Sequence, residues 1–346
     1  MDELTRSIAQ EIELRREYIP NSSVSTIYFG GGTPSVLCRD GVERIMKQIS
    51  SVFLIDSDAE ITIEVNPDDV TEENAFMWRD IGFNRVSMGV QSWDDRVLKA
   101  INRRHTSKQV SLAIERLKKA DFQNISVDLI YGLPYQDMDT WQMDVRRTTQ
   151  YDIQHISSYG LSFEEGTLLY QWLKAGKIQE QEDDMYNEMY DFLCDHLLVH
   201  GFEHYEVSNF ARQGYRSRHN SSYWNDTVYW GFGPGAHSYN GDSRQWNVDN
   251  LDKYIHDITY KVVPYEMEML TQQQKWEEYV MLRMRVKEGM DLTKAGILFG
   301  KNQVDRCLDL ASPYLLQGYL YRQDDQLRAT RKGIKILNRI IEDLID

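Results

Sequence analysis

The sequence has few cysteines, no long apolar runs and little positive charge. Cys38, Cys194 and Cys307 lie far apart in a chain of 346 residues, which argues against a disulfide framework and leaves no CxxC-type pair for a metal or cluster. No apolar run approaches the ~18 residues that a bilayer-spanning helix needs. The start, Met1-Asp2-Glu3-Leu4, is not a basic segment followed by an apolar one. We therefore expect a cytoplasmic protein with reduced thiols and no transmembrane segment.

Positive charge is outweighed, because 39 lysines and arginines stand against 54 aspartates and glutamates, for a net charge of −15. Nucleic acids are bound through clustered lysine and arginine, so an acidic chain repels them. We predict no nucleic-acid partner. The apolar fraction of 41% and the aromatic fraction of 12% are those of a globular protein with a sizeable core.

Short β-like runs alternate with helical patterns in the first half of the chain. The runs cover 25–29, 61–65, 85–90, 125–130 and 155–159, and helical spacing of apolar residues occupies 40–53, 72–80, 94–102, 108–120 and 139–149. These intervals are typical of βα units of ~30 residues. The sequence therefore predicts an α/β fold with a parallel sheet, a partial (β/α)6 barrel.

The second half of the chain has a different pattern. Helical spacing recurs at 182–200, 271–287, 302–317 and 332–344, an aromatic and glycine-containing stretch covers 202–246, and a hairpin is predicted to turn at Asp324-Asp325. We divide the chain into a barrel over 1–170, an α/β extension over 171–265, and a helical, winged-helix-like domain over 266–346.

Polar or glycine-rich residues stand at the ends of the predicted strands. Gly30-Gly31-Gly32-Thr33-Pro34 follows the first run, and Glu64, Gln91 and Asp128 lie in or just beyond three others. Parallel α/β folds bind ligands at the carboxyl ends of their strands. An unpaired buried polar group costs ~1–3 kcal/mol, so several of them at successive strand ends indicate a ligand pocket. The glycine segment lacks the Lys-Ser/Thr of a Walker loop, and taken alone it is equally consistent with a tight strand-to-helix turn.

Seven motifs carry a resemblance to a known family. They are YFGGGTPS (28–35), EVNP (64–67), RVSMGVQS (85–92), RHT (104–106), VDLIYGLP (127–134), YEVSNFA (205–211) and GPGAHS (233–238). In this order they closely resemble the radical S-adenosylmethionine proteins related to oxygen-independent coproporphyrinogen III oxidase, and specifically the haem-chaperone branch. The resemblance runs from the first helix to the C-terminus and implies a radical-SAM-type barrel.

The resemblance also implies a binding site for S-adenosylmethionine. The matching residues are Gly31, Gly32, Thr33, Glu64, Gln91, Arg103 and Asp128. The first three match the backbone that holds the methionyl end, and the other four match positions that hold the ribose and polar groups. At Arg103 the alternatives are a solvated arginine, or Arg104 in its place after a small shift in register.

The family binds a [4Fe–4S] cluster through a CxxxCxxC loop, and the cluster's fourth iron holds the amino and carboxylate groups of S-adenosylmethionine. These cluster cysteines are absent from the sequence, and the spacing of the three cysteines present does not replace them. Either the sequence starts after that loop or the cluster has been lost; the retained pocket residues favour the first explanation. We expect the chain as given to be inactive in radical chemistry, and we assign no catalytic residue.

A further motif, HNxxYW, runs from His219 to Trp224 and resembles the signature of the haem-chaperone branch. Imidazole can ligate haem iron, and aromatic rings can cover the macrocycle. We predict haem contacts from His219, Asn220, Tyr223 and Trp224, with His219 as the iron ligand; the alternative is a loop histidine packed on core aromatics. His237 is a second candidate for porphyrin contact, with use in the core as its alternative.

Three functions follow from these patterns and the resemblance. The first is a haem-binding chaperone that delivers haem to recipient haemoproteins. The second is an oxygen-independent coproporphyrinogen III oxidase, which performs the oxidative decarboxylation to protoporphyrinogen IX in porphyrin biosynthesis. The third is a cluster-less, S-adenosylmethionine-binding regulatory protein. The cofactors implied are S-adenosylmethionine, the [4Fe–4S] cluster of the family and haem.

Overall fold

The computed structural model describes residues 1–19 and 23–345, which divide into two compact units. The first unit is built from 1–27, 37–59 and 218–346, and the second from 28–36 and 60–217. Each unit thus combines stretches that are distant in sequence. The three-part linear division of the chain stays a prediction.

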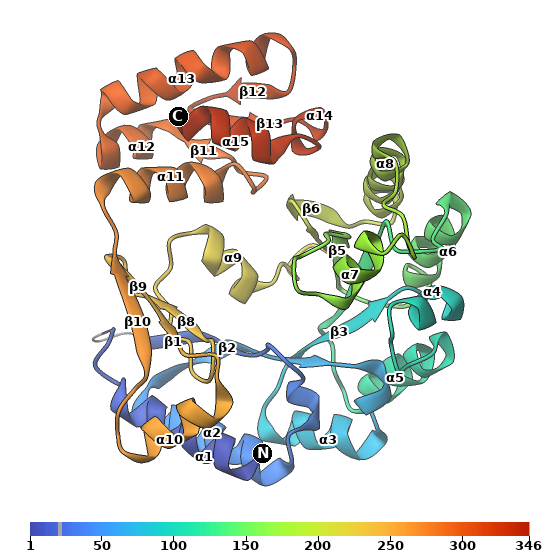
Figure 1. The fold of residues 1–346 in the computed structure, drawn as a ribbon, viewed down its shortest axis with the longest axis vertical. Helices are drawn as coiled ribbons and strands as arrows, with labels where there is room; N and C mark the ends of the chain where they lie inside the picture. The colour runs from blue at the N-terminus through green and yellow to red at the C-terminus, as the bar shows by residue number, and fades with distance from the viewer. Residues whose placement is uncertain (20–22, 346) are drawn as a thin grey trace. The chain divides into compact units, whose positions relative to one another are not determined.

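In the described part of the chain, seven strands form one sheet in the order β1-β2-β3-β4-β5-β7-β6 (Figure 1). The strands are β1 (Ser23–Phe29), β2 (Leu54–Val65), β3 (Arg85–Gln91), β4 (Ile125–Tyr131), β5 (His155–Gly160), β6 (Glu203–Glu206) and β7 (Asn209–Ala211). Strands β2 to β5 are parallel, whereas β7 is antiparallel to both β5 and β6. The sheet begins with β1 and ends with β6, so it is an open, partial barrel, as predicted.

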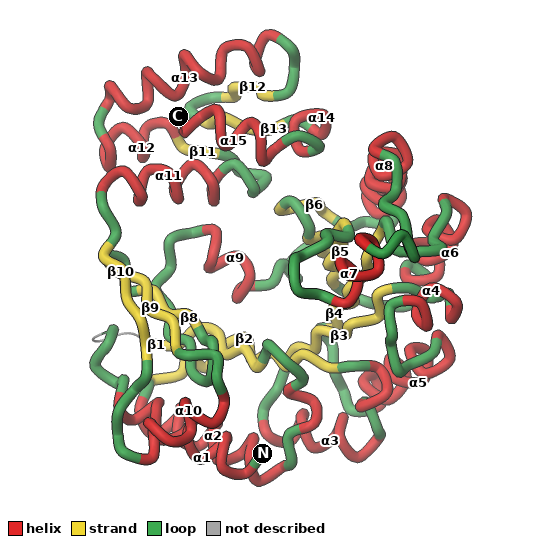
Figure 2. Tube along the Cα trace, in the orientation of Figure 1, coloured by secondary structure: helices red, strands yellow, loops and turns green. Residues whose placement is uncertain are grey.

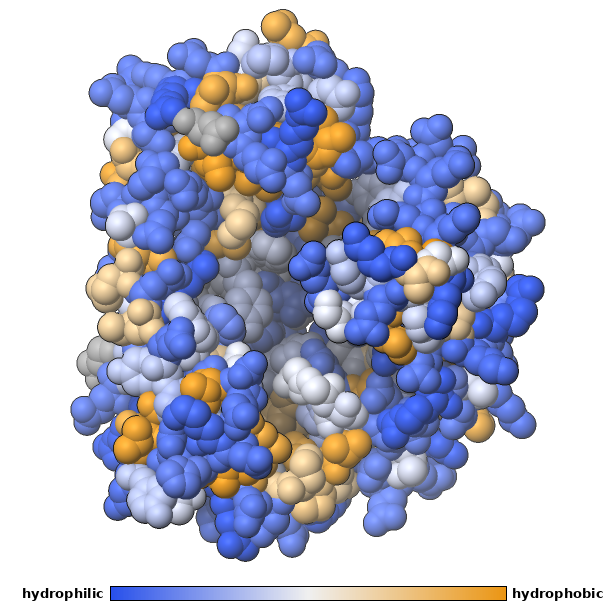
Figure 3. Space-filling view, viewed as in Figure 1, coloured by the Kyte–Doolittle hydropathy of each residue, from blue (hydrophilic) through white to orange (hydrophobic). Residues whose placement is uncertain are grey.

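Helices alternate with these strands, which Figure 2 shows by colour. They are α1 (Asp2–Leu14), η1 (Pro34–Val36), α2 (Arg39–Val52), η2 (Pro67–Asp69), α3 (Glu72–Ile81), α4 (Asp95–Ala100), α5 (Ser107–Lys119), α6 (Met138–Thr148), α7 (Leu168–Lys174) and α8 (Asp183–Val199). Three of these helices start at threonine caps, since the Thr71, Thr106 and Thr167 side chains accept hydrogen bonds from the first turns of α3, α5 and α7. Figure 3 shows mainly hydrophilic side chains over α4, α5 and α6, as expected for helices that bury only one stripe.

Strand alternation separates an apolar face of the sheet from a polar one. In β3, Val86, Met88 and Val90 are fully buried, and in β4 Val127 and Leu129 are as well. Side chains of successive strand residues point to opposite faces. The intervening polar residues therefore share the other face, and the pairing of the strands sets Glu64 beside Ser87 and Gly89 beside Asp128.

The rest of the chain adds two small sheets, whose strand orders are β10-β9-β8 and β11-β13-β12. The elements are α9 (Arg218–Trp224), β8 (His237–Tyr239), β9 (Ser243–Asn247), α10 (Leu251–Thr259), β10 (Tyr265–Met269), α11 (Gln272–Arg283), β11 (Met290–Asp291), α12 (Leu292–Phe299), α13 (Lys301–Leu316), β12 (Leu320–Gln323), β13 (Gln326–Ala329), α14 (Arg331–Ile334) and α15 (Leu337–Ile345).

The C-terminal segment has the predicted helical pattern with a hairpin. The turn between β12 and β13 contains Asp324, at φ 53°, and Asp325. The single helix expected over 332–344 is instead divided into α14 and α15. Among residues 1–19 and 23–345, we find no helix with both the length and the apolar character needed to cross a membrane.

Candidate functional site

The turn after β1 is tightly packed on one side and open on the other. A Cβ atom on Gly30 would lie 2.3 Å from Cε1 of Tyr28 and 2.8 Å from Oε1 of Glu64. Gly31 and Gly32 both have positive φ, 73° and 63°, which glycine adopts without strain. No described atom lies within 4 Å of a Cβ built on either of them. The backbone of this turn is therefore accessible to a ligand on the side of Gly31 and Gly32.

Glu64, near the end of β2, holds this turn against the sheet. Its Oε1 accepts a hydrogen bond from the Tyr28 hydroxyl at 2.7 Å, and its Oε2 accepts one from the Gly31 N–H at 3.2 Å. Burial and the adjacent Glu64 charge raise the pKa of Tyr28 well above its ordinary value, so the phenol stays a donor. Thr33 follows, and its carbonyl accepts from Val36 N–H as η1 begins.

Asp128 lies on the same face of the sheet, on β4. The hydroxyl of Ser87 donates to its Oδ1 at 3.3 Å. Burial, together with the charge of Glu64, raises the pKa of Asp128 to about 6, against the opposing hydrogen bonds of Ser157 and Ser87. This carboxyl group changes charge close to neutral pH, and when ionised it can accept hydrogen bonds from ligand hydroxyls.

Gln91 and Arg103 converge on Gly89, the residue that pairs with Asp128. A Cβ on Gly89 would lie 2.8 Å from Nε2 of Gln91 and 2.9 Å from Nη2 of Arg103. The register of β3 and β4 shifts between Gly89 and Gln91, and Gln91 has φ 67°. Such a β-bulge changes the direction of the strand and of the side chains that follow it, here that of Gln91. Burial lowers the pKa of Arg103, partly offset by the charges of Asp128 and Asp68.

Arg104, the alternative to Arg103, lies elsewhere. Its side chain is 64% exposed, and its Nη2 is 3.1 Å from Oδ2 of Asp68 and 3.5 Å from Oδ1 of Asp69. Arg103, which is half-buried, is therefore the arginine that stands with Gln91 at the strand ends. The structure thus gathers the predicted residues of the glycine turn, Glu64, Gln91, Arg103 and Asp128 at the ends of four neighbouring strands.

Two basic side chains on the same face were not selected from the sequence. Arg85 is 1% exposed, and its Nε and Nη2 have no hydrogen-bond partner among the described residues. His155 contacts the hydroxyls of Ser126 at 2.7 Å and Tyr205 at 2.8 Å, and burial holds its pKa well below its ordinary value. The sequence pattern could have pointed to Arg85. In RVSMGVQ it alternates with apolar residues in the same phase as Ser87 and Gln91, so it faces the polar side of the strand.

Asp144, on α6, accepts hydrogen bonds from the segments that follow β3 and β4. It is fully buried, and its two oxygens accept from the Ser92 hydroxyl and the Trp93 N–H, each at 2.7 Å. Gln136 donates to it at 3.1 Å. Burial raises the pKa of Asp144 to about 6, despite these hydrogen bonds. The segments that follow β3 and β4 are thereby tied to one carboxyl group.

The donor set for an iron–sulfur cluster is not present in the described residues. Cys38 is exposed and Cys194 and Cys307 are buried, each as a free thiol. Within 1–19 and 23–345, no three histidine, cysteine, aspartate or glutamate side chains are grouped to hold a metal ion. The residues described do not fit a [4Fe–4S] cluster, which is held by cysteine thiolates.

The HNxxYW motif forms the helix α9, which the sequence did not predict. His219 uses both ring nitrogens, with Nδ1 3.0 Å from Oγ1 of Thr26 on β1 and Nε2 3.0 Å from the hydroxyl of Tyr223. The two rings meet edge to face at 5.1 Å between centroids. Both side chains remain partly exposed, and His219 packs on an exposed aromatic ring; its role as a haem ligand stays a prediction.

Aromatic side chains continue from Tyr223 into the surrounding loop. Tyr229 contacts Tyr223 edge to face at 5.0 Å, and Tyr239 lies 6.3 Å from Tyr229. Asn220 and Trp224 are half-buried on α9, and the indole N–H of Trp224 is buried with no hydrogen-bond partner among the described residues. The tyrosine rings could pack on a flat ligand with an apolar face.

Both ends of α9 are anchored. At its start, Arg218 donates to the carbonyl of Asp58 at 2.7 Å and lies 3.2 Å from its carboxylate. Just past its end, Asn225 and Asp226 receive hydrogen bonds from Arg283 of α11, at 2.8 and 2.5 Å. The backbone of the motif is therefore held from two sides.

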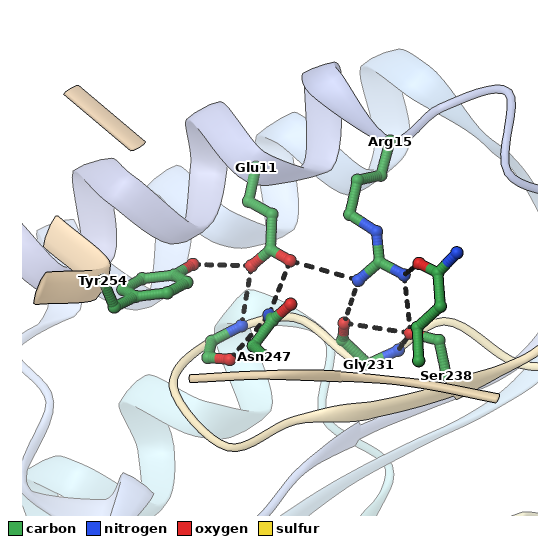
Figure 4. A network of polar contacts seen from close by, with 8 residues as sticks. Glu11, Arg15, Gly231, Ser238, Asn247 and Tyr254 are labelled. Atoms are coloured by element: carbon green, nitrogen blue, oxygen red, sulfur yellow. Dashed lines mark hydrogen bonds and ion pairs between the residues drawn. The ribbon is translucent and has the colours of Figure 1, made fainter. Parts of the chain in front are cut away.

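The GPGAHS segment is held by a buried network drawn in Figure 4. Gly233 N–H donates to Glu11 at 2.8 Å, and Arg15 donates to the carbonyl of Gly231 and to the Ser238 hydroxyl, each at 2.9 Å. Glycine is required at 233 by its φ of 109° and at 231 because a Cβ there would lie 2.0 Å from the carbonyl oxygen of His237. His237 itself is exposed and stacks near Trp246, so its alternative use as a core residue is wrong.

Known proteins are similar to this chain in sequence and in fold. Residues 2–147 match the Radical SAM superfamily, and residues 270–336 match the HemN C-terminal domain. The heme chaperone HemW of Lactococcus lactis subsp. lactis is 34% identical, over 92% of this chain and 83% of its own length. The heme chaperone HemW of Bacillus subtilis is 32% identical, over 98% of this chain and 90% of its own.

The structure of the coproporphyrinogen III oxidase HemN from Escherichia coli, a radical SAM enzyme, superposes with a TM-score of 0.86 at 22% identity and covers 99% of this chain and 82% of that one. The fold is therefore that of a radical S-adenosylmethionine protein with a HemN-type C-terminal domain. Within that class, the chain belongs to the family of the heme chaperone HemW.

Proposed function

We propose that this chain binds haem at α9 and delivers it to haem-dependent proteins. The observation that carries the proposal is the setting of His219. Its half-exposed imidazole contacts Thr26 and Tyr223, and the Tyr223 ring in turn packs on Tyr229. Relatives at 34% and 32% identity are named heme chaperones, which supports the same proposal. Haem is the cargo here, and the recipient is a haemoprotein.

The chain's own residues supply the contacts that such a cargo needs. An imidazole nitrogen is a common axial ligand of haem iron. Tyr223 and Tyr229 offer aromatic surface for the macrocycle, and the indole N–H of Trp224 is a donor without a partner among the described residues. The anchors at Arg218 and Arg283 hold the backbone of α9 near both of its ends.

Haem titration of the purified chain tests this proposal. In His219→Ala we expect the shift of the Soret band to be lost or strongly weakened. The matched control is His256→Ala, which removes an exposed imidazole from α10 and is expected to bind haem as the wild type does. Equal haem binding by His219→Ala and wild type would overturn the assignment of the ligand.

A second candidate is binding of S-adenosylmethionine at the strand ends. It is favoured by one observation, the convergence of Glu64, Gln91, Arg103 and Asp128 beside the open backbone of Gly31. In this arrangement the turn would hold the methionyl end, and the acidic and amide side chains would accept and donate hydrogen bonds to the ribose. The family implies S-adenosylmethionine together with a cluster, and we derive no radical step because the described residues lack the cluster's donor set.

Coproporphyrinogen III oxidation is the remaining alternative. Its support is the shared fold, and at 22% identity that likeness concerns the fold alone. Turnover of coproporphyrinogen III by the chain would favour this activity over haem delivery. We expect none from the chain as given.

A further inference from the structure

We propose that Tyr223 is a gate on His219: its hydroxyl occupies the nitrogen that would bind iron, and haem enters when this side chain rotates away. The inference rests on the proposed function and concerns the regulation of the same site.

The two nitrogens of His219 have different surroundings. The contact between Nδ1 and Thr26 is partly buried, whereas the contact between Nε2 and Tyr223 is exposed. A bulky planar ligand therefore reaches Nε2 more easily than Nδ1. A neutral imidazole has one donor nitrogen and one acceptor nitrogen, and iron needs the acceptor.

In the gate, the hydroxyl oxygen of Thr26 accepts the hydrogen bond from Nδ1–H of His219. When Nδ1–H donates to the Thr26 hydroxyl oxygen, the lone pair of the ring lies on Nε2. Metal-binding histidines commonly donate their other N–H in this manner, which fixes the ring's orientation and tautomer. Thr26 is thus a positioning residue for His219.

Tyr223 then competes with iron for the same lone pair. With Nδ1–H donated to Thr26, the phenol of Tyr223 donates to Nε2 at 3.0 Å. The spacing of the two residues, four apart on α9, sets their side chains side by side on one face of the helix. Iron cannot bind Nε2 while this hydrogen bond is in place.

The gate opens through the Tyr223 side chain and not through the helix. Arg218 with Asp58 holds one end of α9, and Arg283 with Asn225 holds the other. The Tyr223 side chain is 42% exposed, so its ring can rotate toward solvent. Rotation breaks the hydrogen bond to Nε2 of His219 and the edge-to-face contacts with His219 and Tyr229.

Haem titration of four variants tests the gate. Tyr223→Phe removes the competing hydroxyl and keeps the ring, so haem should bind about two- to tenfold more tightly, the equivalent of one hydrogen bond. The control is Tyr260→Phe, which removes an exposed hydroxyl at the end of α10 and should leave affinity unchanged. Thr26→Val removes the acceptor for Nδ1–H and should weaken binding by about two- to tenfold. His219→Ala reports on the proposed function itself.

Once circular dichroism shows that each variant is folded, the titrations distinguish failure of the gate from failure of the proposed function. Unchanged affinity in Tyr223→Phe, with His219→Ala weakened, overturns the gate and leaves the proposed function standing. Weaker binding in Tyr223→Phe with an altered Soret position would mean that the phenol itself binds iron, which also overturns the gate. Unchanged binding in His219→Ala overturns the proposed ligand. If Tyr223→Phe unfolds, Tyr223→Leu, which also lacks the hydroxyl, decides in the same way.

Discussion

The carboxylate of Glu11 accepts a hydrogen bond from the hydroxyl of Tyr254 at 2.6 Å, which joins α1 to α10 across 243 residues of sequence. The same carboxylate accepts from the Gly233 N–H, from Asn247 at 2.7 Å and from Arg15 at 3.1 Å. Glu11 is fully buried, so these four donors replace the water that its charge would otherwise require.

Removing this carboxylate should destabilise the protein strongly. Glu11→Ala leaves the Arg15 charge buried without its partner, for an expected loss of about 3–5 kcal/mol in the free energy of unfolding. Tyr254→Phe leaves three donors on the carboxylate and should cost about 1 kcal/mol. Urea denaturation measures both. The control is Glu13→Gln, two residues away and half exposed, which should change stability by less than about 0.5 kcal/mol.

The two adjacent arginines should differ in their effect on S-adenosylmethionine binding. Arg103→Ala removes a group that lies at the strand ends with Gln91, whereas Arg104→Ala removes an exposed ion pair with Asp68. We expect binding, followed by ligand-observed NMR at high ligand concentration, to weaken about tenfold or more in Arg103→Ala, as for a lost hydrogen bond to a charged group, and to stay near wild type in Arg104→Ala. The reverse order would favour the shifted register.

Affinity for S-adenosylmethionine in the absence of iron should be low. In the family, the cluster supplies two bonds to the methionyl amine and carboxylate, which the turn at Gly31 and the side chains of Glu64 and Asp128 do not replace. Losing two charge-assisted contacts of ~1.5–3 kcal/mol each weakens binding by about two to four orders of magnitude. Calorimetry measures this directly, and a micromolar or tighter dissociation constant would contradict the argument.

Asp144 should make stability depend on pH in a defined direction. Its pKa is raised to about 6 in the folded state, so the folded chain binds more protons than the unfolded chain between the two pKa values, and the free energy of unfolding falls as pH rises through that window. The difference between wild type and Asp144→Asn should therefore shrink by about 1 kcal/mol from about pH 5 to about pH 7.

Asp137→Asn is the control for this pH dependence. The Asp137 carboxylate caps α6, and the hydrogen bonds from Thr140 lower its pKa. Its contribution is present above the unfolded pKa, so the difference from wild type should stay constant from about pH 5 to about pH 7. Denaturant unfolding at the two pH values measures both variants, and parallel profiles for the two would contradict the assignment to Asp144.

Local sequence patterns were enough to predict the order of strands and helices between residues 23 and 160 and the class of the fold. In segments such as 85–91, apolar residues alternate with other residues because each strand has one apolar and one polar face, which is a property of the strand alone. The spacing between strands reflects the length of a βα unit. The same local patterns selected Glu64, Gln91 and Asp128, because parallel strands present their carboxyl ends at one edge. The helix α9 was missed, since its seven residues bury no apolar stripe.

Local patterns could not predict which of two adjacent arginines lies at the strand ends, or which residues distant in sequence contact each other. Both depend on the tertiary structure. Arg103 and Arg104 have the same chemistry, and the irregular end of β3 together with Asp68 separates them. Thr26 meets His219, and Glu11 meets Tyr254, although 193 and 243 residues of sequence separate the members of each pair. Sequence patterns report the neighbours of a residue within a few positions, whereas these contacts depend on how whole elements pack. Packing therefore supplies the hydrogen-bond partners of both His219 and Glu11.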